Sequence, residues 1–130
     1  MKTIKELVEK KFKFYQKKAV SDNVISNAEK ELNISLAQDY KDYLKCYGAC
    51  SFSSHEFTGL GFSGYMNVVS ATNEERRVNS NFPKDMYIIE NLAIEGVLIV
   101  QNSKGEVFEY TRSSINKIYN SFKDYLKSLC

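Results

Sequence analysis

The chain has 130 residues, close to the commonest size of a single domain, and its 43% hydrophobic and 26% charged residues exclude a disordered chain. No apolar run is long enough to span a membrane, since Val97–Val100 has only four residues, and the N-terminal segment lacks the apolar region of a secretory signal. We therefore expect one cytoplasmic domain that makes no membrane contact.

The net charge of +2 is unevenly distributed along the chain. Residues 1–18 hold seven lysines and two glutamates, a net +5, whereas residues 19–130 hold eleven basic and fourteen acidic side chains, a net −3. A basic N-terminal segment therefore precedes a mildly acidic body. Lysines with interleaved aromatic residues can bind nucleic acid, but Phe12 and Tyr15 belong to the apolar stripe of a predicted helix, so no nucleic-acid partner is expected.

Two amphipathic helices are predicted at the start of the chain. The first covers residues 3–18 and carries an apolar stripe of Ile4, Leu7, Val8, Phe12 and Tyr15. Ser21 and Asp22 are candidate N-caps of the second helix, because short polar side chains accept hydrogen bonds from the first free amides of a helix. The predicted buried face of this second helix consists of Ile25, Ala28 and Leu32.

A third helix is predicted over Tyr40–Tyr47. Apolar residues recur there at the spacing i, i+4, i+7, i+8 and i+11, namely Leu36, Tyr40, Tyr43, Leu44 and Tyr47. Gly48 follows the last of them, at the place where a residue of positive φ commonly ends a helix.

The middle of the chain is predicted to form short strands, a helix and a hairpin. Ser, Gly and aromatic residues indicate strands at Cys50–Ser53 and His55–Leu60, and a helical pattern covers Asn67–Asn79. Further strands are predicted at Met86–Glu90, Gly96–Gln101 and Glu106–Tyr110, the last two joined by a turn at Asn102–Gly105. The wholly apolar run Val97–Val100 indicates a strand covered on both faces.

A last helix is predicted from about Ser113 to the end of the chain. Apolar residues recur there at a helical period, namely Ile115, Ile118, Tyr119, Phe122, Leu126 and Leu129. These elements predict a single α+β domain over residues 1–130, with a mostly antiparallel sheet flanked by helices at both chain ends. Residues 1–18 would be a basic N-terminal helix, and residues 21–129 the core of the domain.

No motif in the chain indicates catalysis or a cofactor. Residues 59–64 match G-x-G-x-x-G, but three predicted helices precede them and no βαβ unit surrounds them, so a plain glycine loop is the preferred interpretation. His55 with Cys46 and Cys50 makes too few ligands, at an unfamiliar spacing, for a zinc site. The three cysteines indicate reduced thiols. We expect no catalytic residue, no cofactor and no metal.

The order of the elements, with several short phrases, resembles the SUKH superfamily, the Smi/Knr-type domain. The matching positions lie in the second, third and last predicted helices: Ile25, Glu29, Leu32, Leu36, Asp39, Tyr40, Tyr43, Leu44, Gly48, Ser121, Phe122, Tyr125 and Leu126. The chain departs from the family pattern at Asn33, Ala37 and Tyr47, where the family commonly has Gly, Pro and Asn. The first departure is mild, because Asn can adopt the left-handed turn conformation.

The resemblance implies a function that the residues alone do not indicate. Many bacterial members of the superfamily look like immunity proteins, which neutralise a polymorphic or contact-dependent toxin by binding it. On that analogy the chain is a non-enzymatic antitoxin, a monomer or weak dimer, whose partner is a cognate protein toxin. Its acidic body would suit a basic nuclease. The alternatives are a general protein-interaction module of the Smi/Knr type and a small nucleic-acid-binding protein.

The best candidate for a partner surface is Ser51–Tyr65, because this segment holds more aromatic area than a short loop needs for its own packing. Aromatic anchors inside a polar rim are typical of binding hot spots. The predicted contact residues are aromatic residues of this segment and glutamates near it in sequence: Glu56, Phe57, Phe62, Tyr65, Glu74 and Glu75. The alternative is that these aromatic residues simply cover the sheet.

Overall fold

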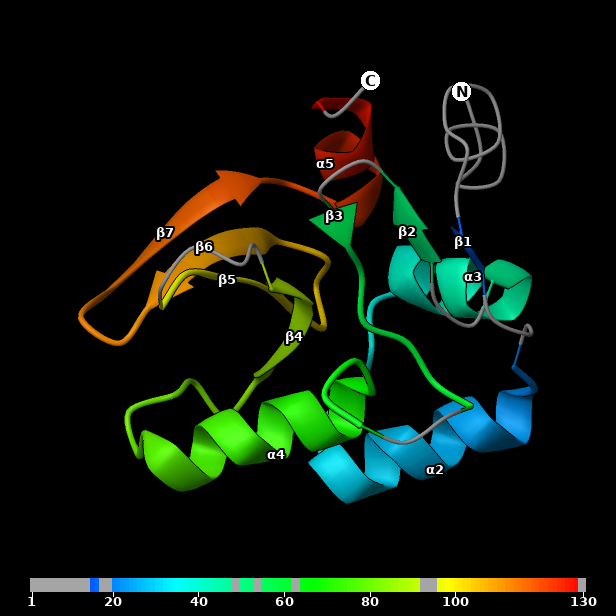
Figure 1. The fold of residues 1–130 in the computed structure, drawn as a ribbon, viewed down its shortest axis with the longest axis horizontal. Helices are drawn as coiled ribbons and strands as arrows, with labels where there is room; N and C mark the ends of the chain where they lie inside the picture. Colours follow the sequence, from blue (N-terminus) through cyan, green and yellow to red (C-terminus); the bar gives the residue numbers. More distant parts are fainter. Residues whose placement is uncertain are drawn as a thin grey trace.

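A four-stranded antiparallel sheet of order β4-β5-β6-β7 has helices on both of its faces in the computed structural model (Figure 1). The structure describes residues 15–16, 20–47, 50–52, 55–61, 64–91 and 96–128. The strands of this sheet are β4 (Met86–Asn91), β5 (Leu98–Asn102), β6 (Val107–Thr111) and β7 (Ser114–Tyr119). The helices within the described residues are α2 (Asp22–Leu32), α3 (Gln38–Tyr47), α4 (Val68–Val78) and α5 (Phe122–Ser128). A smaller antiparallel sheet joins β1 (Tyr15–Gln16), β2 (Cys50–Phe52) and β3 (His55–Glu56).

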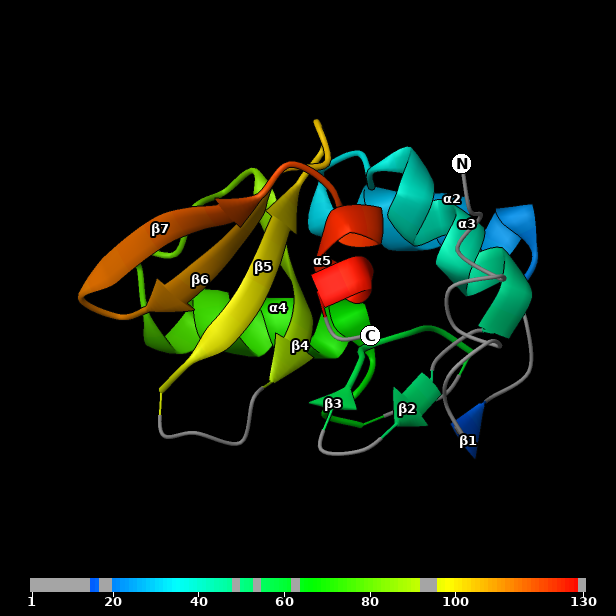
Figure 2. The ribbon, with the colours of Figure 1, turned by 90° about the horizontal axis from the view of Figure 1, so that it is seen from above.

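Strands β4 and β5 are covered on both faces, because the side chains along each of them alternate between two apolar clusters. On β4, Ile89 belongs to the larger cluster and Ile88 to the smaller one. On β5, Ile99 and Val100 divide in the same way. α4 contacts β4 and supplies Ala71 to the smaller cluster, whereas the larger cluster takes residues from α2, α3 and α5 and also Val68 from α4. Seen from above, α4 lies beneath the strands, and α5 and α3 lie beside them (Figure 2). The prediction that the apolar run of β5 is covered on both faces is confirmed.

Aromatic rings from three separate segments form the centre of the larger cluster. Tyr43 of α3, Phe57 after β3 and Phe122 of α5 meet edge to face, with ring centroids between 5.3 and 6.3 Å apart. Such pairs are more favourable than their buried area alone implies. The three segments are distant in sequence, so this contact joins the middle of the chain to both helices.

Buried tyrosine hydroxyls in this cluster have internal partners. The hydroxyl of Tyr87 accepts a hydrogen bond from the Ala37 amide at 2.9 Å and donates one to Oε1 of Gln101 at 2.6 Å. The hydroxyl of Tyr40 bonds Oγ1 of Thr58 at 2.8 Å. Burial raises the pKa of both tyrosines, so both hydroxyls stay protonated at physiological pH.

Local capping signals explain the bounds of α2. The Ser21 hydroxyl accepts a hydrogen bond from the Val24 amide at 3.4 Å, as an N-cap does. The helix ends at Asn33, whose φ of +57° lies in the left-handed region, and the Asn33 amide donates to the carbonyl of Lys30. Of the two candidate N-caps the structure uses Ser21, and the predicted buried face of this helix is confirmed.

The prediction of the last helix is wrong over its first half. Residues Ser114–Tyr119 form strand β7, paired with β6, and α5 begins only at Phe122. The helical spacing in this segment does not correspond to a buried helix face. Ile115 is 41% exposed, whereas Ile118, beside the irregularity in the β6–β7 pairing, packs on the larger cluster. The tight turn after β6 places this segment directly beside β6, and the antiparallel ladder, from Thr111 opposite Ser114 to Val107 opposite Tyr119, fixes it as a strand.

The N-terminal helix also differs from its prediction where it can be compared. Tyr15 and Gln16 form a strand paired with β2, and apart from these two the predicted helix lies outside the described residues, as does Gly48. The strand predicted over His55–Leu60 is shorter, because β3 ends at Glu56 and is followed by two isolated bridges, from Phe57 to Glu90 and from Gly59 to Asn67. The helix predicted over Asn67–Asn79 and the three strands after it are confirmed, and so is the α+β class with a mainly antiparallel sheet.

Candidate functional site

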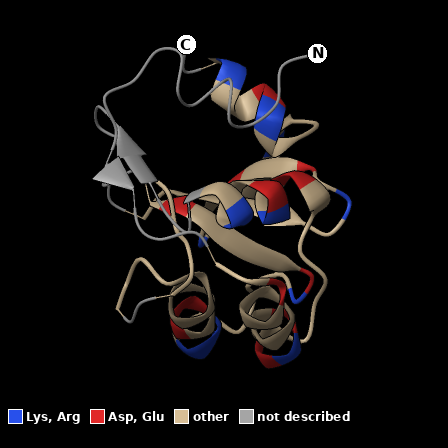
Figure 3. Cartoon of the chain, turned by 90° about the vertical axis from the view of Figure 1, so that its right-hand side faces the viewer, with Lys and Arg blue, Asp and Glu red and all other residues tan. Residues whose placement is uncertain are grey.

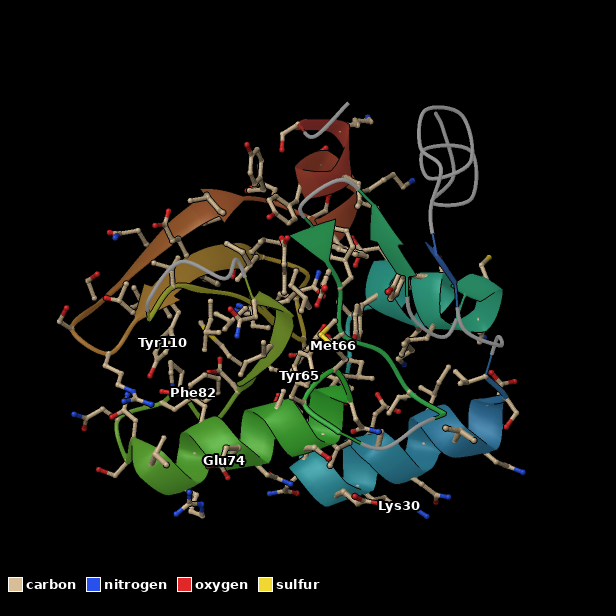
Figure 4. All side chains as sticks on the ribbon, viewed as in Figure 1. Lys30, Tyr65, Met66, Glu74, Phe82 and Tyr110 are labelled. Carbon is tan, nitrogen blue, oxygen red and sulfur yellow. The ribbon has the colours of Figure 1, made fainter. Side chains whose placement is uncertain are left out.

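Three of the six predicted contact residues line one hollow between α4 and the main sheet. Tyr65, Glu74 and Glu75 border a cavity of about 370 Å³, which we name the Tyr65 hollow. Its apolar lining comes from the loop before α4, from α4, and from β4 and β5: Met66, Ala71, Ile88 and Leu98. In Figure 4, Tyr65 and Met66 lie above α4 and Glu74 lies on the helix. Tyr65 is 74% exposed, so its ring is available to a partner.

The other three predicted contact residues do not line this hollow. Phe57 is fully buried in the aromatic cluster, so it is a core residue and cannot touch a partner at the folded surface. For Phe57 the alternative interpretation, that the aromatic residues cover the sheet, is the correct one. Phe62 lies outside the described residues. Glu56 is exposed beside the hollow, where its Oε2 accepts a hydrogen bond from the Tyr65 hydroxyl at 3.5 Å.

The position of α4 is set at its N-terminus and again at its centre. The Asn67 side chain accepts hydrogen bonds from two amides of the first turn, at 2.9 and 3.1 Å. Thr72 is fully buried, and its hydroxyl oxygen accepts a hydrogen bond from the Ile88 amide of β4 at 3.0 Å. This bond holds the helix against the sheet and thereby brings Glu74 and Glu75, which lie two and three residues further along α4, to the hollow.

Glycines shape the loop that presents Tyr65. Gly64 has a φ of +113°, which L-residues with a side chain rarely adopt, and its carbonyl accepts a hydrogen bond from the Asn67 amide at 3.0 Å. The Gly59 amide donates to the carbonyl of Met66 at 2.9 Å. These bonds tie the loop to the start of α4 on both sides of Tyr65. In the described part of this loop, the G-x-G-x-x-G glycines therefore serve the turn into α4.

Glu75 stands where the Tyr65 hollow meets a second hollow. It lines the first cavity and also a cavity of about 580 Å³ that reaches the β6–β7 turn. Its Oε2 accepts hydrogen bonds from the Tyr110 hydroxyl and from Nε of Arg112, both at 3.1 Å. Its Oε1 accepts a longer bond of 3.4 Å from Nη2 of Arg112. The Glu75 side chain is 12% exposed, so its carboxylate is held in a fixed position, and burial raises the pKa of the Tyr110 hydroxyl beside it.

Glu74 is far more exposed than its neighbour Glu75. Both of its carboxylate oxygens accept hydrogen bonds from Arg77, at 2.6 and 3.1 Å, along the outer side of the helix. The Arg77 hydrogen bonds hold the pKa of the Glu74 carboxyl below its usual value. Figure 3 shows such mixed charges on the outward sides of α2 and α4, the two helices seen nearly end on.

A third hollow continues the concave surface towards α2. It has a volume of about 390 Å³ and lies between α2, the loop before α4 and α4 itself. Ser70 lines both this hollow and the Tyr65 hollow, while Glu75, Asn91 and Leu98 line both the Tyr65 hollow and the hollow at the β6–β7 turn. The three hollows adjoin one another along α4, and we name them together the trough.

Sequence reasoning missed several residues of the trough. Arg112 lies 37 positions from Glu75 and reaches it only because the β6–β7 turn brings the two together. Asn91 and Leu98 are opposite each other in the β4–β5 ladder, so both arrive at the same end of the sheet. Once β4 and β5 are paired in register, the alternation of side chains predicts that Leu98 faces α4.

The structure gives no indication of a metal site in its described part, where no group of three or more His, Cys, Asp or Glu residues could hold an ion. Within the same residues, Cys46 is an exposed free thiol. No helix among them is both long and apolar enough to cross a membrane. Glu90 is a fully buried carboxyl, to which the Tyr125 hydroxyl donates a hydrogen bond.

The fold and the trough together define a small α+β domain with an antiparallel sheet and three hollows that share lining residues. The family model SUKH_5, described as SMI1-KNR4 cell-wall, matches residues 1–130, so the chain belongs to the SUKH family. Domains of this family are typically immunity proteins and generally non-catalytic. Among curated proteins no match to the chain was found.

Proposed function

We propose that this SUKH domain is a non-enzymatic immunity protein that neutralises a cognate protein toxin by binding it through the trough. Family membership supports the immunity role, because SUKH domains typically have it. The observation that carries the choice of surface is the Tyr65 ring, which is 74% exposed at the edge of a hollow lined by apolar side chains and two carboxylates. An exposed aromatic anchor beside an apolar hollow with a polar rim has the composition of a binding hot spot.

The residues proposed to contact the toxin are Tyr65, Glu74 and Glu75, which line the trough, and Glu56, which bonds the Tyr65 hydroxyl beside it. Their carboxylates give this surface an acidic rim, which would attract a basic toxin and raise the rate of association. A bound toxin would cover the trough along α4, and occlusion of the toxin's own active site by this domain would abolish its activity.

The test starts from the genes next to the one for this chain: a toxin encoded there is co-expressed with the chain in a host that the toxin kills. The wild-type chain should rescue growth, whereas Tyr65→Ala and Glu74→Lys should each stay folded, lose rescue and bind the purified toxin about 10-fold or more weakly. The matched control is Glu109→Lys, because Glu109 is exposed on β6 on the side of the sheet opposite α4. The Glu109→Lys variant should rescue growth as well as the wild-type chain does.

Two outcomes would contradict the proposal in different ways. If both trough variants rescue as well as the wild type, the toxin binds elsewhere on the domain. If the wild-type chain binds a partner but never rescues growth, the chain is a general interaction module instead of an immunity protein.

A further inference from the structure

We infer that the Tyr65 hollow takes a single arginine side chain presented by the toxin, an inference that rests on the proposed function. The hollow has about 370 Å³ of space, within the range of roughly 300–1,000 Å³ that small-ligand pockets occupy. An arginine side chain has an apolar stem and a planar cationic head. The chemistry of the hollow suits each of these parts.

The charges that line the hollow all have one sign. Among its described lining residues, Glu74 and Glu75 are the charged ones, and no lysine or arginine lines it. A guanidinium in the hollow would have carboxylate acceptors within reach at two positions of α4. Charge-assisted hydrogen bonds of a guanidinium to carboxylates are among the stronger polar contacts in proteins.

The remaining lining suits the arginine stem and the flat face of its head group. Met66, Ile88 and Leu98 provide an apolar lining along which methylene groups can pack. The exposed Tyr65 ring borders the same space and offers a face on which a guanidinium can stack. The combination of apolar wall, aromatic ring and paired carboxylates distinguishes this hollow from the one beside α2, where Glu31 is the charged residue among the described lining.

The chain's own arginines hold these carboxylates from outside the hollow. Arg77 bonds Glu74 and Arg112 bonds Glu75, and neither arginine lines the Tyr65 hollow. Arg77 and Glu74 are both mostly exposed, so their ion pair contributes little to stability and is readily exchanged. Glu75 is only 12% exposed and keeps its bonds to Arg112 and Tyr110. Oε1 of Glu75 accepts only the long 3.4 Å bond among the bonds described, and a carboxylate oxygen can accept two. An arginine from the toxin would therefore add to Glu75 and compete with Arg77 for Glu74.

The competition predicts effects of opposite sign for two neighbouring substitutions. Glu74→Gln should weaken binding of the arginine, because it removes a charge that the guanidinium would bond. Arg77→Gln should strengthen it, because it frees the Glu74 carboxylate. A purely structural role of α4 would make both substitutions neutral or both harmful.

The first experiment is a titration of the ¹⁵N-labelled full chain with the peptide acetyl-Gly-Arg-Gly-amide, followed by NMR. Saturable shifts should centre on the amides of Tyr65, Glu74 and Glu75, with a Kd on the order of millimolar. The matched peptide has citrulline in place of arginine, which keeps the shape and removes the charge, and it should give no saturable shift there. Relative to the wild type, Kd should rise about threefold or more in Glu74→Gln and fall in Arg77→Gln, while Glu109→Gln should leave it unchanged.

Equal shifts with the citrulline peptide would overturn the inference, and so would the absence of saturable shifts with the arginine peptide. The amide spectrum of each variant reports whether it is folded, so a misfolded variant cannot be mistaken for a binding defect. The rescue assay separates the two proposals. If the wild-type chain rescues growth but does not bind the peptide, the immunity function is retained and the arginine site is rejected. If it binds the peptide but does not rescue growth, the arginine site is retained and the immunity function is rejected.

Discussion

The tyrosine hydroxyls on one side of the main sheet and the glutamate carboxylates on the other are held in different ways. On the side of the larger cluster, the Tyr40 and Tyr87 hydroxyls are buried and bond internal partners. On the side of α4, the carboxylates of Glu74 and Glu75 are held by arginines that are themselves mostly exposed. A bond to a buried partner cannot be given up without a large desolvation cost, whereas an exposed ion pair can be exchanged for another at little cost.

This difference suggests that the two sides of the sheet have different roles: the aromatic side stabilises the fold, and the α4 side binds a partner. The aromatic side joins segments from distant parts of the chain, so a change there should affect the whole fold. The α4 side carries a smaller cluster with an open trough above it, so a change at its rim should affect binding alone. The following predictions test this division, from the largest expected effect to the smallest.

Phe57→Ala should lower the free energy of unfolding by about 3–5 kcal/mol, because it empties the centre of the aromatic cluster. Tyr65→Ala, the aromatic substitution on the opposite side, should change it by no more than about 0.5 kcal/mol, because the ring is mostly exposed. Urea unfolding of both variants measures the contrast. Similar losses in the two variants would show that the Tyr65 ring also supports the fold.

Thr72→Val should lower the free energy of unfolding by about 1–3 kcal/mol, because the buried Ile88 amide would lose its acceptor. Valine fills nearly the same space, so the change isolates the hydrogen bond between α4 and β4. Thr72→Ser keeps the hydroxyl and is the matched control for that bond, and it should recover most of the stability in thermal unfolding. If Thr72→Val is as stable as the wild type, α4 is held by packing alone.

The smallest effect should be the pH dependence of the Glu74–Arg77 pair. The pair holds the pKa of the Glu74 carboxyl below its usual value of 4.5, so its stabilising contribution is present above that pH. The contribution is lost as the pH falls through the lowered pKa, where the carboxyl gains its proton in the folded state. Arg77→Gln should therefore have a slightly lower Tm than the wild type at pH 7, and the gap should close at acid pH. If the difference in Tm between Arg77→Gln and the wild type is the same at pH 7 and at acid pH, Arg77 acts through packing.

Elements whose ends carry their own capping residues were predictable from the sequence. Ser21 and Asn33 bound α2 by hydrogen bonds within a few residues, and Asn67 does the same for the start of α4. The alternation of β4 and β5 between two clusters was likewise visible as apolar runs. Local interactions of this kind need no partner from elsewhere in the chain.

The segment Ser114–Tyr119 shows where this kind of reasoning fails. Its apolar spacing suits a helix, but pairing with β6 makes it a strand. A local signal for the true helix start was present, since the Ser121 hydroxyl accepts a hydrogen bond from the Asp124 amide at 3.0 Å. Periodicity over a few residues cannot rank a helix against a hairpin, because the partner strand supplies the deciding hydrogen bonds.

The sequence by itself determined the α+β class, most of the helices and strands, and three residues that meet at one hollow. Only the tertiary structure decided that Phe57 is core while Tyr65 is exposed, and that Arg112 reaches Glu75 across 37 positions. The physical reason is the sequence separation over which each interaction acts: capping hydrogen bonds and the alternation of side chains involve residues that are close in the chain. Burial and the shape of a concave surface depend instead on how separate elements pack, which no short stretch of sequence contains.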